Sequence, residues 1–341
     1  MTGAADGNGL ALALPVLDPD LEARLRDRLL EIEERLEREI YSEAPFVTEA
    51  ARHLLRAGGK RFRPLLVLLA AEFGPSPAAA EVVEAAVVVE LTHVATLYHD
   101  DVMDEAALRR GTSTANARWD NSVAILTGDW LFARASDLVA SLGPEAVRIQ
   151  ARTFGRLVEG QIRETLGVTD GQDPLAHYLS VVADKTGSLI ATSALFGARF
   201  AGASTEIQET LRAFGEEIGA AFQLADDILD VASESGQSGK TPGTDLREGV
   251  PTLPVLIFRA QADPAEETDA RLLELLDSDL TDDAGLAETL ALLRAHPSLQ
   301  QAEDDVRRRA DDARKLLEDL PEGSARAALE SLCDLVVTRT A

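Results

Sequence analysis

Apolar residues recur at helical spacing along most of the chain. The first series consists of Leu21, Leu25, Leu29, Ile32, Leu36 and Ile40. Its steps of three or four residues predict an amphipathic helix with a charged outer face. Two later segments, 65–71 and 82–97, are apolar on nearly every side, which is typical of helices at the centre of a bundle. No segment alternates like a strand, so the pattern predicts an all-α protein.

The chain shows no internal repeat and no obvious linker between domains. Residues 1–18 are rich in glycine and alanine, which predicts a flexible N-terminal tail. Residues 19–341 then form one helical domain, a size that the length of 341 residues allows. Residues 233–251 are rich in glycine and contain two prolines, so we expect an irregular loop of the kind that often serves as a lid.

The charge of the chain excludes some classes of partner. The formal net charge is 33 − 59 = −26, which argues against nucleic acids and anionic membrane surfaces. A single cysteine, Cys333, excludes an intrachain disulfide framework. The sequence contains no apolar run of about 18 residues and does not begin with a basic signal-peptide region. We therefore predict a cytoplasmic protein without a membrane-spanning segment.

Two acidic clusters share one spacing, and each follows an apolar helical run. They consist of Asp100, Asp101 and Asp104, and of Asp226, Asp227 and Asp230. Carboxylates at positions i, i+1 and i+4 crowd one side of a helix and repel one another unless a cation lies between them. Mg²⁺ prefers such oxygen ligands and commonly bridges them to phosphates. A solvated acidic face would explain one cluster, but two copies on apolar helices favour metal binding.

Cations gather in a glycine turn between two helical segments. Gly58 and Gly59 interrupt the first segment, and Lys60, Arg61 and Arg63 follow at once. So many positive charges in a strongly acidic chain predict an anion site, although a solvated loop is the alternative. His93 lies seven residues before Asp100, on the same stripe of an ideal helix, so we group it with the carboxylates.

These groups together suit the ionisation of a diphosphate ester. Two opposed aspartate clusters would hold Mg²⁺ around the diphosphate, and apolar helices would supply a dry cavity. The metal ions would stabilise the leaving group, and the cavity would protect a carbocation from water. The separate cationic turn suggests a second phosphorylated substrate.

The motifs resemble those of the trans-polyprenyl diphosphate synthases. The shared motifs, in the order of that family over roughly residues 50–260, are G-G-K-R-F-R-P, D-D-x-x-D, R-R-G, K-T, F-Q-L-A-D-D-I-L-D and G-K-T-P-G-T-D-L. The resemblance implies the isoprenoid synthase fold, a single large helical bundle around a central cavity, usually as a homodimer. It also implies Mg²⁺-dependent condensation of isopentenyl diphosphate with an allylic diphosphate. Ionisation, condensation and elimination would give an all-trans polyprenyl diphosphate, and the departing diphosphate would take the proton.

The resemblance also implies roles for individual residues. The six aspartates would bind Mg²⁺ and, together with Lys185, carry out catalysis. Contacts to the allylic diphosphate would come from Arg109, Lys185, Thr186, Gln223 and Lys240. Isopentenyl diphosphate would be held by Lys60, Arg63, His93 and Arg110. One position departs, because Val250 stands where the family often has lysine, so one diphosphate contact is missing or comes from Arg247.

The length of the product depends, by the same resemblance, on the floor of the cavity. Ala95 and Thr96 precede the first acidic cluster, and both are small where bulky aromatic residues would stop elongation early. The cluster also lacks the two-residue insertion of many bacterial farnesyl diphosphate synthases. We therefore expect a product of C20 or longer and favour C35–C45, a precursor of a quinone side chain. A geranylgeranyl or farnesyl diphosphate synthase is the alternative.

Three other classes of protein remain as hypotheses. A terpene cyclase of the same fold would need one diphosphate site, so the Lys60–Arg63 turn and Arg110 argue against it. A His-Asp phosphohydrolase is suggested by His99-Asp100, but only five histidines are present and none completes a metal site. A non-catalytic partner subunit would typically have lost an acidic cluster, and both clusters are intact.

Overall fold

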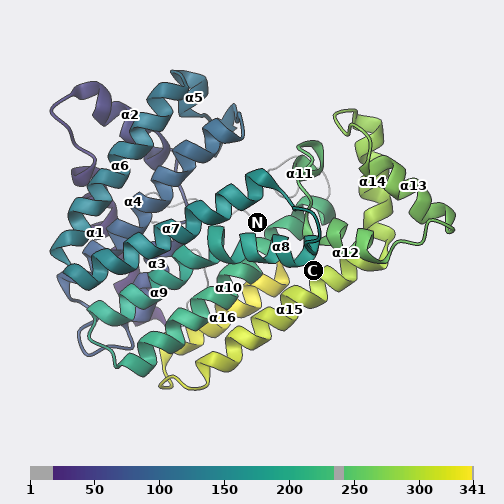
Figure 1. The fold of residues 1–341 in the computed structure, drawn as a ribbon. Coiled ribbons are helices and arrows are strands. Elements are labelled where there is room, and N and C mark those ends of the chain that lie inside the picture. Colours follow the sequence, from purple (N-terminus) through teal and green to yellow (C-terminus); the bar gives the residue numbers. More distant parts are fainter. Residues whose placement is uncertain (1–17, 234–241, 340–341) are drawn as a thin grey trace, which may run out of the picture. The chain divides into compact units, whose positions relative to one another are not determined.

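The computed structural model describes residues 18–233 and 242–339, and these are almost entirely helical (Figure 1). The all-α prediction is confirmed. The only strands in these ranges are β1 (Leu108–Arg109) and β2 (Thr112–Ser113), which pair antiparallel. Two-residue strands are too short to produce an alternating sequence pattern. Among the described helices, none has the length and apolar character needed to cross a membrane.

The chain divides into two compact units, which we describe separately. The first comprises the chain up to Gly155, Leu189–Gly215 and Leu317–Ser331. The second comprises Arg156–Ser188, Glu216–Leu316 and the chain from Leu332 onward. The predicted tail lies almost wholly outside the described residues, and the single domain over residues 19–341 stays a prediction.

The first unit is built around one apolar helix. Its helices are α1 (Pro19–Glu39), α2 (Pro45–Arg56), α3 (Phe62–Ala71), α4 (Ala80–Met103), α5 (Ala115–Arg118), α6 (Asn121–Ser141) and, from its second residue, α9 (Ser188–Phe200). Parts of α7 (Pro144–Leu166), α10 (Thr205–Ala232) and α16 (Ser324–Thr338) complete it. Helix α4 packs against α1, α3 and α6, and nearly all its side chains before the first acidic cluster are buried. This burial explains why its sequence is apolar all round.

The amphipathic helix predicted near the N-terminus is α1. The Asp18 carboxylate caps it by accepting hydrogen bonds from the backbone N–H groups of Asp20 (2.9 Å) and Leu21 (3.1 Å). The six apolar residues that predicted the helix are all buried. Helix α1 thus covers one side of α4 and presents its charged face to solvent.

A glycine allows α6 to approach the end of α4 closely. A Cβ atom on Gly128 would lie 2.3 Å from Nε2 of His99 and 3.1 Å from the backbone oxygen of Ala95. A side chain at this position would displace the His99 ring and press against the backbone of α4. This contact fixes the last turns of α4, the segment that carries the first acidic cluster.

The second unit contains the second acidic cluster. Besides the rest of α7, α10 and α16, it comprises α8 (Pro174–Val182), the π-helical turn η1 (Ala183–Gly187), α11 (Thr244–Arg247), α12 (Leu253–Gln261), α13 (Glu267–Leu276), α14 (Asp283–Ala295) and α15 (Pro297–Leu317). The η1 turn packs directly on α7, because a Cβ atom on Gly160 would lie 2.8 Å from the backbone nitrogen of Lys185. Asp184 accepts hydrogen bonds from Arg156 (2.8 Å) and Arg163 (2.7 Å), which ties the turn to α7.

Candidate active site

The first acidic cluster lies at the C-terminal end of α4, and its three carboxylates are buried to different extents. Asp101 is fully buried, Asp100 is partly buried and Asp104 is exposed. Nε of Arg109, on β1, donates to Oδ1 of Asp101. Burial raises the pKa of Asp101, and the hydrogen bond and charge of Arg109 oppose that rise. Arg109, which the resemblance assigns to the allylic diphosphate, therefore contacts an aspartate of the cluster.

One oxygen of this cluster lacks a partner. Oδ2 of Asp101 is buried, and no group in residues 18–233 and 242–339 donates a hydrogen bond to it. A buried carboxylate oxygen without a donor is costly unless a cation or donor completes it. Within the same ranges, no group of three or more His, Cys, Asp or Glu side chains is placed to hold a metal ion by itself. The donor set fits Mg²⁺, which typically binds one or two carboxylates and takes water and phosphate oxygens for the rest.

In the cationic turn before α3, one residue stabilises the fold and the others are available to bind an anion. Arg61 is buried, and its guanidinium donates to Glu33 and Glu90 and to the backbone oxygen of Leu55 (3.0 Å). Its charge is therefore already balanced, so the sequence-based count of three available cations includes one that holds the fold. The neighbouring Lys60 is exposed.

The remaining cations of the turn gather around His93. Burial lowers the pKa of Arg63 to about 10; the charge of Glu90 opposes this effect and that of Arg110 adds to it. Burial also lowers the pKa of His93 well below its usual value, and the charges of Arg63 and Arg110 lower it further. Nε of Arg63 is buried without a hydrogen-bond partner in the described part of the chain. This mutual repulsion among predicted isopentenyl diphosphate ligands would be relieved by an anion.

The backbone of the turn brings these guanidinium groups together. Gly58 and Gly59 have φ angles of 92° and 157°, and Nη1 of Arg110 donates to the backbone oxygen of Gly58. A Cβ atom on Gly59 would lie 2.8 Å from Nη1 of both Arg61 and Arg110. Gly59 therefore leaves room for the arginines, and Gly58 supplies the left-handed backbone conformation of the turn.

The two predicted floor residues lie in the buried stretch of α4. Ala95 is fully buried and Thr96 nearly so, and Oγ1 of Thr96 donates to the backbone oxygen of His93 (2.8 Å). Two aromatic neighbours in the same unit, Phe132 and Phe154, were not predicted from the sequence, and their ring centroids are 4.2 Å apart. Phe132 also lies 5.8 Å from the ring of His99. These contacts join α4, α6 and α7, and no local sequence signal identifies them.

In the second cluster, Asp227 is held by two neutral donors. Its carboxylate is buried, and it accepts hydrogen bonds from Oη of Tyr178 and from Nε2 of Gln223 (3.0 Å). Burial raises the pKa of Asp227 to about 6, although both hydrogen bonds oppose that rise. Tyr178 was not singled out from the sequence, because it lies 49 residues from Asp227.

The other two aspartates of this cluster have different partners. Asp226 forms an ion pair with Arg339 (2.8 Å), whose guanidinium lies 4.5 Å from the ring centroid of Phe222. Asp230 accepts hydrogen bonds from the backbone N–H groups of Thr244 and Asp245, each at 3.1 Å. Each aspartate of the second cluster therefore has a protein partner.

Some residues of the second unit that are predicted to contact the diphosphate lie beside this cluster, and others are paired with other residues of the protein. Oγ1 of Thr186 donates to Oε1 of Gln223 (3.1 Å), and Lys185 pairs with Glu164. Both Lys185 and Thr186 lie in η1, and π-helical turns are frequent at functional sites. Lys240 lies outside the described residues. Val250 is exposed, and Arg247, its suggested substitute, donates to Asp283 and to the backbone of Thr281.

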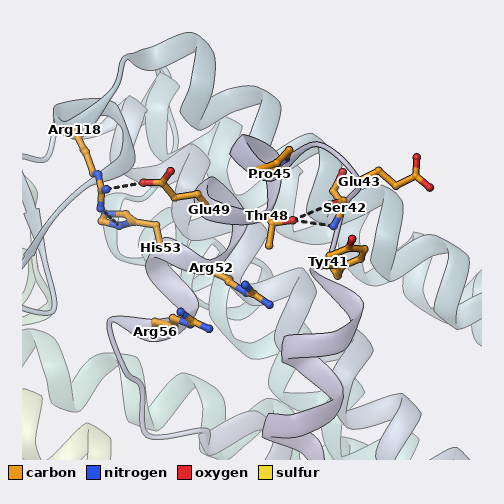
Figure 2. Close-up of a pocket in the computed structure, with 10 residues that line it drawn as sticks. All are labelled: Tyr41, Ser42, Glu43, Pro45, Thr48, Glu49, Arg52, His53, Arg56 and Arg118. Atoms are coloured by element: carbon orange, nitrogen blue, oxygen red, sulfur yellow. Dashed lines mark hydrogen bonds and ion pairs between the residues drawn. The ribbon is translucent and has the colours of Figure 1, made fainter.

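A large open cavity of the first unit contains none of the predicted site residues. Its volume is about 690 Å³. Figure 2 shows its lining, which consists of Tyr41, Ser42, Glu43, Pro45, Thr48, Glu49, Arg52, His53, Arg56 and Arg118. Its arginines form ion pairs with Glu37 and Glu49. Because each of these arginines already has a carboxylate partner, we assign the cavity no part in the chemistry of diphosphates.

Known proteins share both the sequence and the fold. The sequence model of the polyprenyl synthetase family matches residues 44–293. A nonaprenyl diphosphate synthase from Mycobacterium tuberculosis is 49% identical over 94% of this chain and 95% of its own. A dimethylallyltranstransferase of the same organism is 40% identical over 96% of this chain and 98% of its own.

Solved structures of related enzymes have the same fold as this chain. A geranylgeranyl pyrophosphate synthase from Corynebacterium glutamicum, complexed with calcium and isoprenyl diphosphate, matches with a TM-score of 0.87 and 47% identity over 96% of this chain and 99% of that one. A decaprenyl diphosphate synthase from Rhodobacter capsulatus matches with a TM-score of 0.85 and 34% identity over 94% and 99%. The resemblance found in the motifs is thus confirmed over most of the chain. This chain belongs to the polyprenyl synthetase family and is a prenyl-transferring enzyme, a trans-polyprenyl diphosphate synthase.

Proposed function

We propose that the enzyme condenses isopentenyl diphosphate with an allylic diphosphate in an Mg²⁺-dependent reaction and releases an all-trans product of C20 or longer. The proposal rests on two buried polar atoms in the first unit. A buried carboxylate oxygen of Asp101 and a buried guanidinium nitrogen of Arg63 both lack a partner in the described residues. A cation beside Asp101 and an anion beside Arg63 would supply these partners, as an Mg²⁺–diphosphate complex and a second diphosphate would do.

The proposed roles follow from these charges. Bound Mg²⁺ would neutralise the diphosphate as it leaves the allylic carbon. The aspartates of each cluster would bind Mg²⁺, while Arg63, His93 and Arg110 would hold isopentenyl diphosphate. His93 has a lowered pKa and is neutral at pH 7, so it can donate a hydrogen bond without adding a charge to the crowded cations. The apolar side chains of α4 would exclude water from the carbocation.

The choice of Mg²⁺ is the more specific part of the metal assignment. The related structure from C. glutamicum contains calcium and isoprenyl diphosphate, which supports a divalent ion at this site. Mg²⁺ takes fewer protein ligands than Ca²⁺ and keeps several waters, which suits sparse carboxylates and diphosphate oxygens. Addition of a chelator should abolish turnover, and Mg²⁺ should restore it.

For the product, we favour C35–C45, a quinone side-chain precursor. The relatives include nonaprenyl, heptaprenyl and octaprenyl diphosphate synthases, and the small residues Ala95 and Thr96 support a deep cavity. The geranylgeranyl pyrophosphate synthase of C. glutamicum keeps a C20 product as the alternative. Replacing Ala95 with Phe should shorten the product, as judged by its mass. An unchanged length would remove Ala95 from the cavity floor.

We also propose a cytoplasmic homodimer. Helix α6 exposes Ile125 (43%) and Leu126 (66%), and adjacent exposed apolar residues often mark a protein interface. A two-fold axis would pair this surface with itself. Light scattering should give twice the mass of one chain, 36.5 kDa, and Leu126→Glu should reduce it.

A substrate-omission assay tests the proposed reaction directly. Diphosphate release and elongation should require Mg²⁺, isopentenyl diphosphate and an allylic primer together. A terpene cyclase would release diphosphate from the primer alone, and a phosphohydrolase would accept either substrate. Release without isopentenyl diphosphate would therefore contradict the proposal.

A further inference from the structure

Tyr178 of α8 makes a contact that the proposed reaction does not yet explain. Its hydroxyl donates to Oδ2 of Asp227, in the second acidic cluster. The hydroxyl of Tyr98, by contrast, donates to the backbone oxygen of Ala50 and accepts from the backbone N–H of Leu54 (3.2 Å). Tyr178 therefore places a neutral donor on a carboxylate that the family motif assigns to metal binding.

The second oxygen of the same carboxylate is also fixed. Nε2 of Gln223 donates to Oδ1 of Asp227, and Oε1 of that amide accepts from Oγ1 of Thr186. The Thr186 contact sets which end of the Gln223 amide faces Asp227. With one donor on each oxygen, rotation of the carboxylate would break a hydrogen bond, and Asp227 is too buried for water to replace it (6% exposed).

The neighbouring aspartates are held differently. Asp226 is paired with Arg339, and Asp230 accepts from the backbone of Thr244 and Asp245. Asp227 accepts hydrogen bonds from two neutral side chains, those of Tyr178 and Gln223. Hydrogen bonds from outside the ligand set typically orient metal ligands, and their loss typically weakens metal affinity.

We propose that Tyr178 is a positioning residue that holds the Asp227 carboxylate, with Gln223, in the orientation in which the second cluster binds the metal–diphosphate complex. The inference rests on the proposed function, because it concerns how the cluster meets its metal. In this role Tyr178 would act through Asp227 and not by direct contact with metal or substrate. Its removal should therefore alter the response to Mg²⁺ more than the rate at saturating Mg²⁺.

The test is the Mg²⁺ concentration that gives half-maximal turnover. Tyr178→Phe should raise it about 10-fold or more, with kcat at saturating Mg²⁺ nearly retained. Tyr98→Phe is the matched control, since it removes a hydroxyl whose partners within the described residues are backbone groups. It should lower the melting temperature without moving the Mg²⁺ response. A wild-type Mg²⁺ response in Tyr178→Phe would overturn the inference.

A second variant and a binding measurement guard against a folding defect. Gln223→Met removes the other donor, and it should shift the Mg²⁺ response in the same direction. Calorimetry with Mg²⁺ and inorganic diphosphate should show the same loss of affinity without turnover. If the wild-type enzyme elongates no primer, the proposed function fails. If it elongates normally while both variants bind Mg²⁺–diphosphate like the wild type, only the role of Tyr178 fails.

Discussion

The two acidic clusters have the same spacing in sequence but opposite surroundings in structure. In the first, Oδ2 of the buried Asp101 has no donor within the described ranges, and Asp104 is exposed at the end of α4. In the second, Asp226 has an arginine partner, and Asp227 accepts one hydrogen bond on each oxygen. The first cluster thus leaves part of its charge for a ligand to balance, whereas the protein holds the second in place.

This difference shows that a motif identifies the metal-binding carboxylates but does not determine which hydrogen-bond partners they have before the metal binds. Carboxylates that already have donors are ordered before the metal arrives, which reduces the entropy lost on binding. A carboxylate oxygen without a donor, such as Oδ2 of Asp101, gains more from the metal, because its desolvation is uncompensated in the free enzyme. We expect variants of the two clusters to differ mainly in stability and metal response.

The largest effect should come from removing one aspartate of either cluster. Asp100→Ala and Asp226→Ala should each reduce turnover at least ~100-fold, because both would weaken stabilisation of the leaving diphosphate. Asp304→Ala, an exposed position on α15, is the control and should keep the wild-type rate. Steady-state kinetics at saturating substrates measures the effect. Near-normal rates in either cluster variant would contradict the metal assignment of that cluster.

The next effect separates two neighbouring arginines. Arg63→Gln should raise the KM for isopentenyl diphosphate about 10-fold or more by removing a charge-assisted hydrogen bond, with little loss of stability. Arg61→Gln should instead reduce the free energy of unfolding by about 3 kcal/mol, since it leaves Glu33 and Glu90 without their shared partner. Urea unfolding and substrate titration distinguish the two. Equal losses of stability would contradict the division into structural and binding cations.

A smaller effect should appear in the pH dependence of stability without metal. The pKa of Asp227 is raised to about 6 in the folded protein, from an ordinary value of 3.8. The folded state therefore binds more protons between these values, so its stability should fall as the pH rises from about 4 to 6. The contribution of this group is at most roughly 3 kcal/mol. Asp227→Asn should remove it, and identical pH profiles of melting temperature would refute the assignment.

The smallest effect should come from the arginine paired with Asp226. Arg339→Gln removes a positive charge that competes with the metal, so half-maximal activation should need about two- to threefold less Mg²⁺. Arg307→Gln, which breaks an exposed ion pair on α15, is the control and should leave activation unchanged. A higher Mg²⁺ requirement in Arg339→Gln would mean that the arginine assists metal binding.

Much of this organisation follows from local sequence. The apolar spacing of α1 and the all-apolar run of α4 predicted two buried helices, because burial acts on residues one turn apart. The aspartate spacing likewise placed both clusters on helices. Short range also explains what was missed, since a two-residue strand has no period and the π-helical turn around Lys185 has no recognisable pattern.

Contacts between distant residues could not be predicted from the sequence. Arg61 looked like a ligand because its neighbours are cations, yet its partners Glu33 and Glu90 lie 28 and 29 residues away. Tyr178 and Asp227 are 49 residues apart, on different helices. Only the fold brings such pairs together. The structure was therefore needed to identify the partner of each charged residue and to separate charges that stabilise the fold from charges that bind ligands.

The most direct test of the account is the mass of the product. Purified enzyme would be incubated with Mg²⁺, isopentenyl diphosphate and, in separate reactions, C5, C10, C15 and C20 allylic diphosphates. We expect a ladder of products that differ by one C5 unit and end at a single length between C35 and C45. Elongation that stops at C20 or below would contradict the deep cavity, and no elongation with any primer would contradict the proposed reaction.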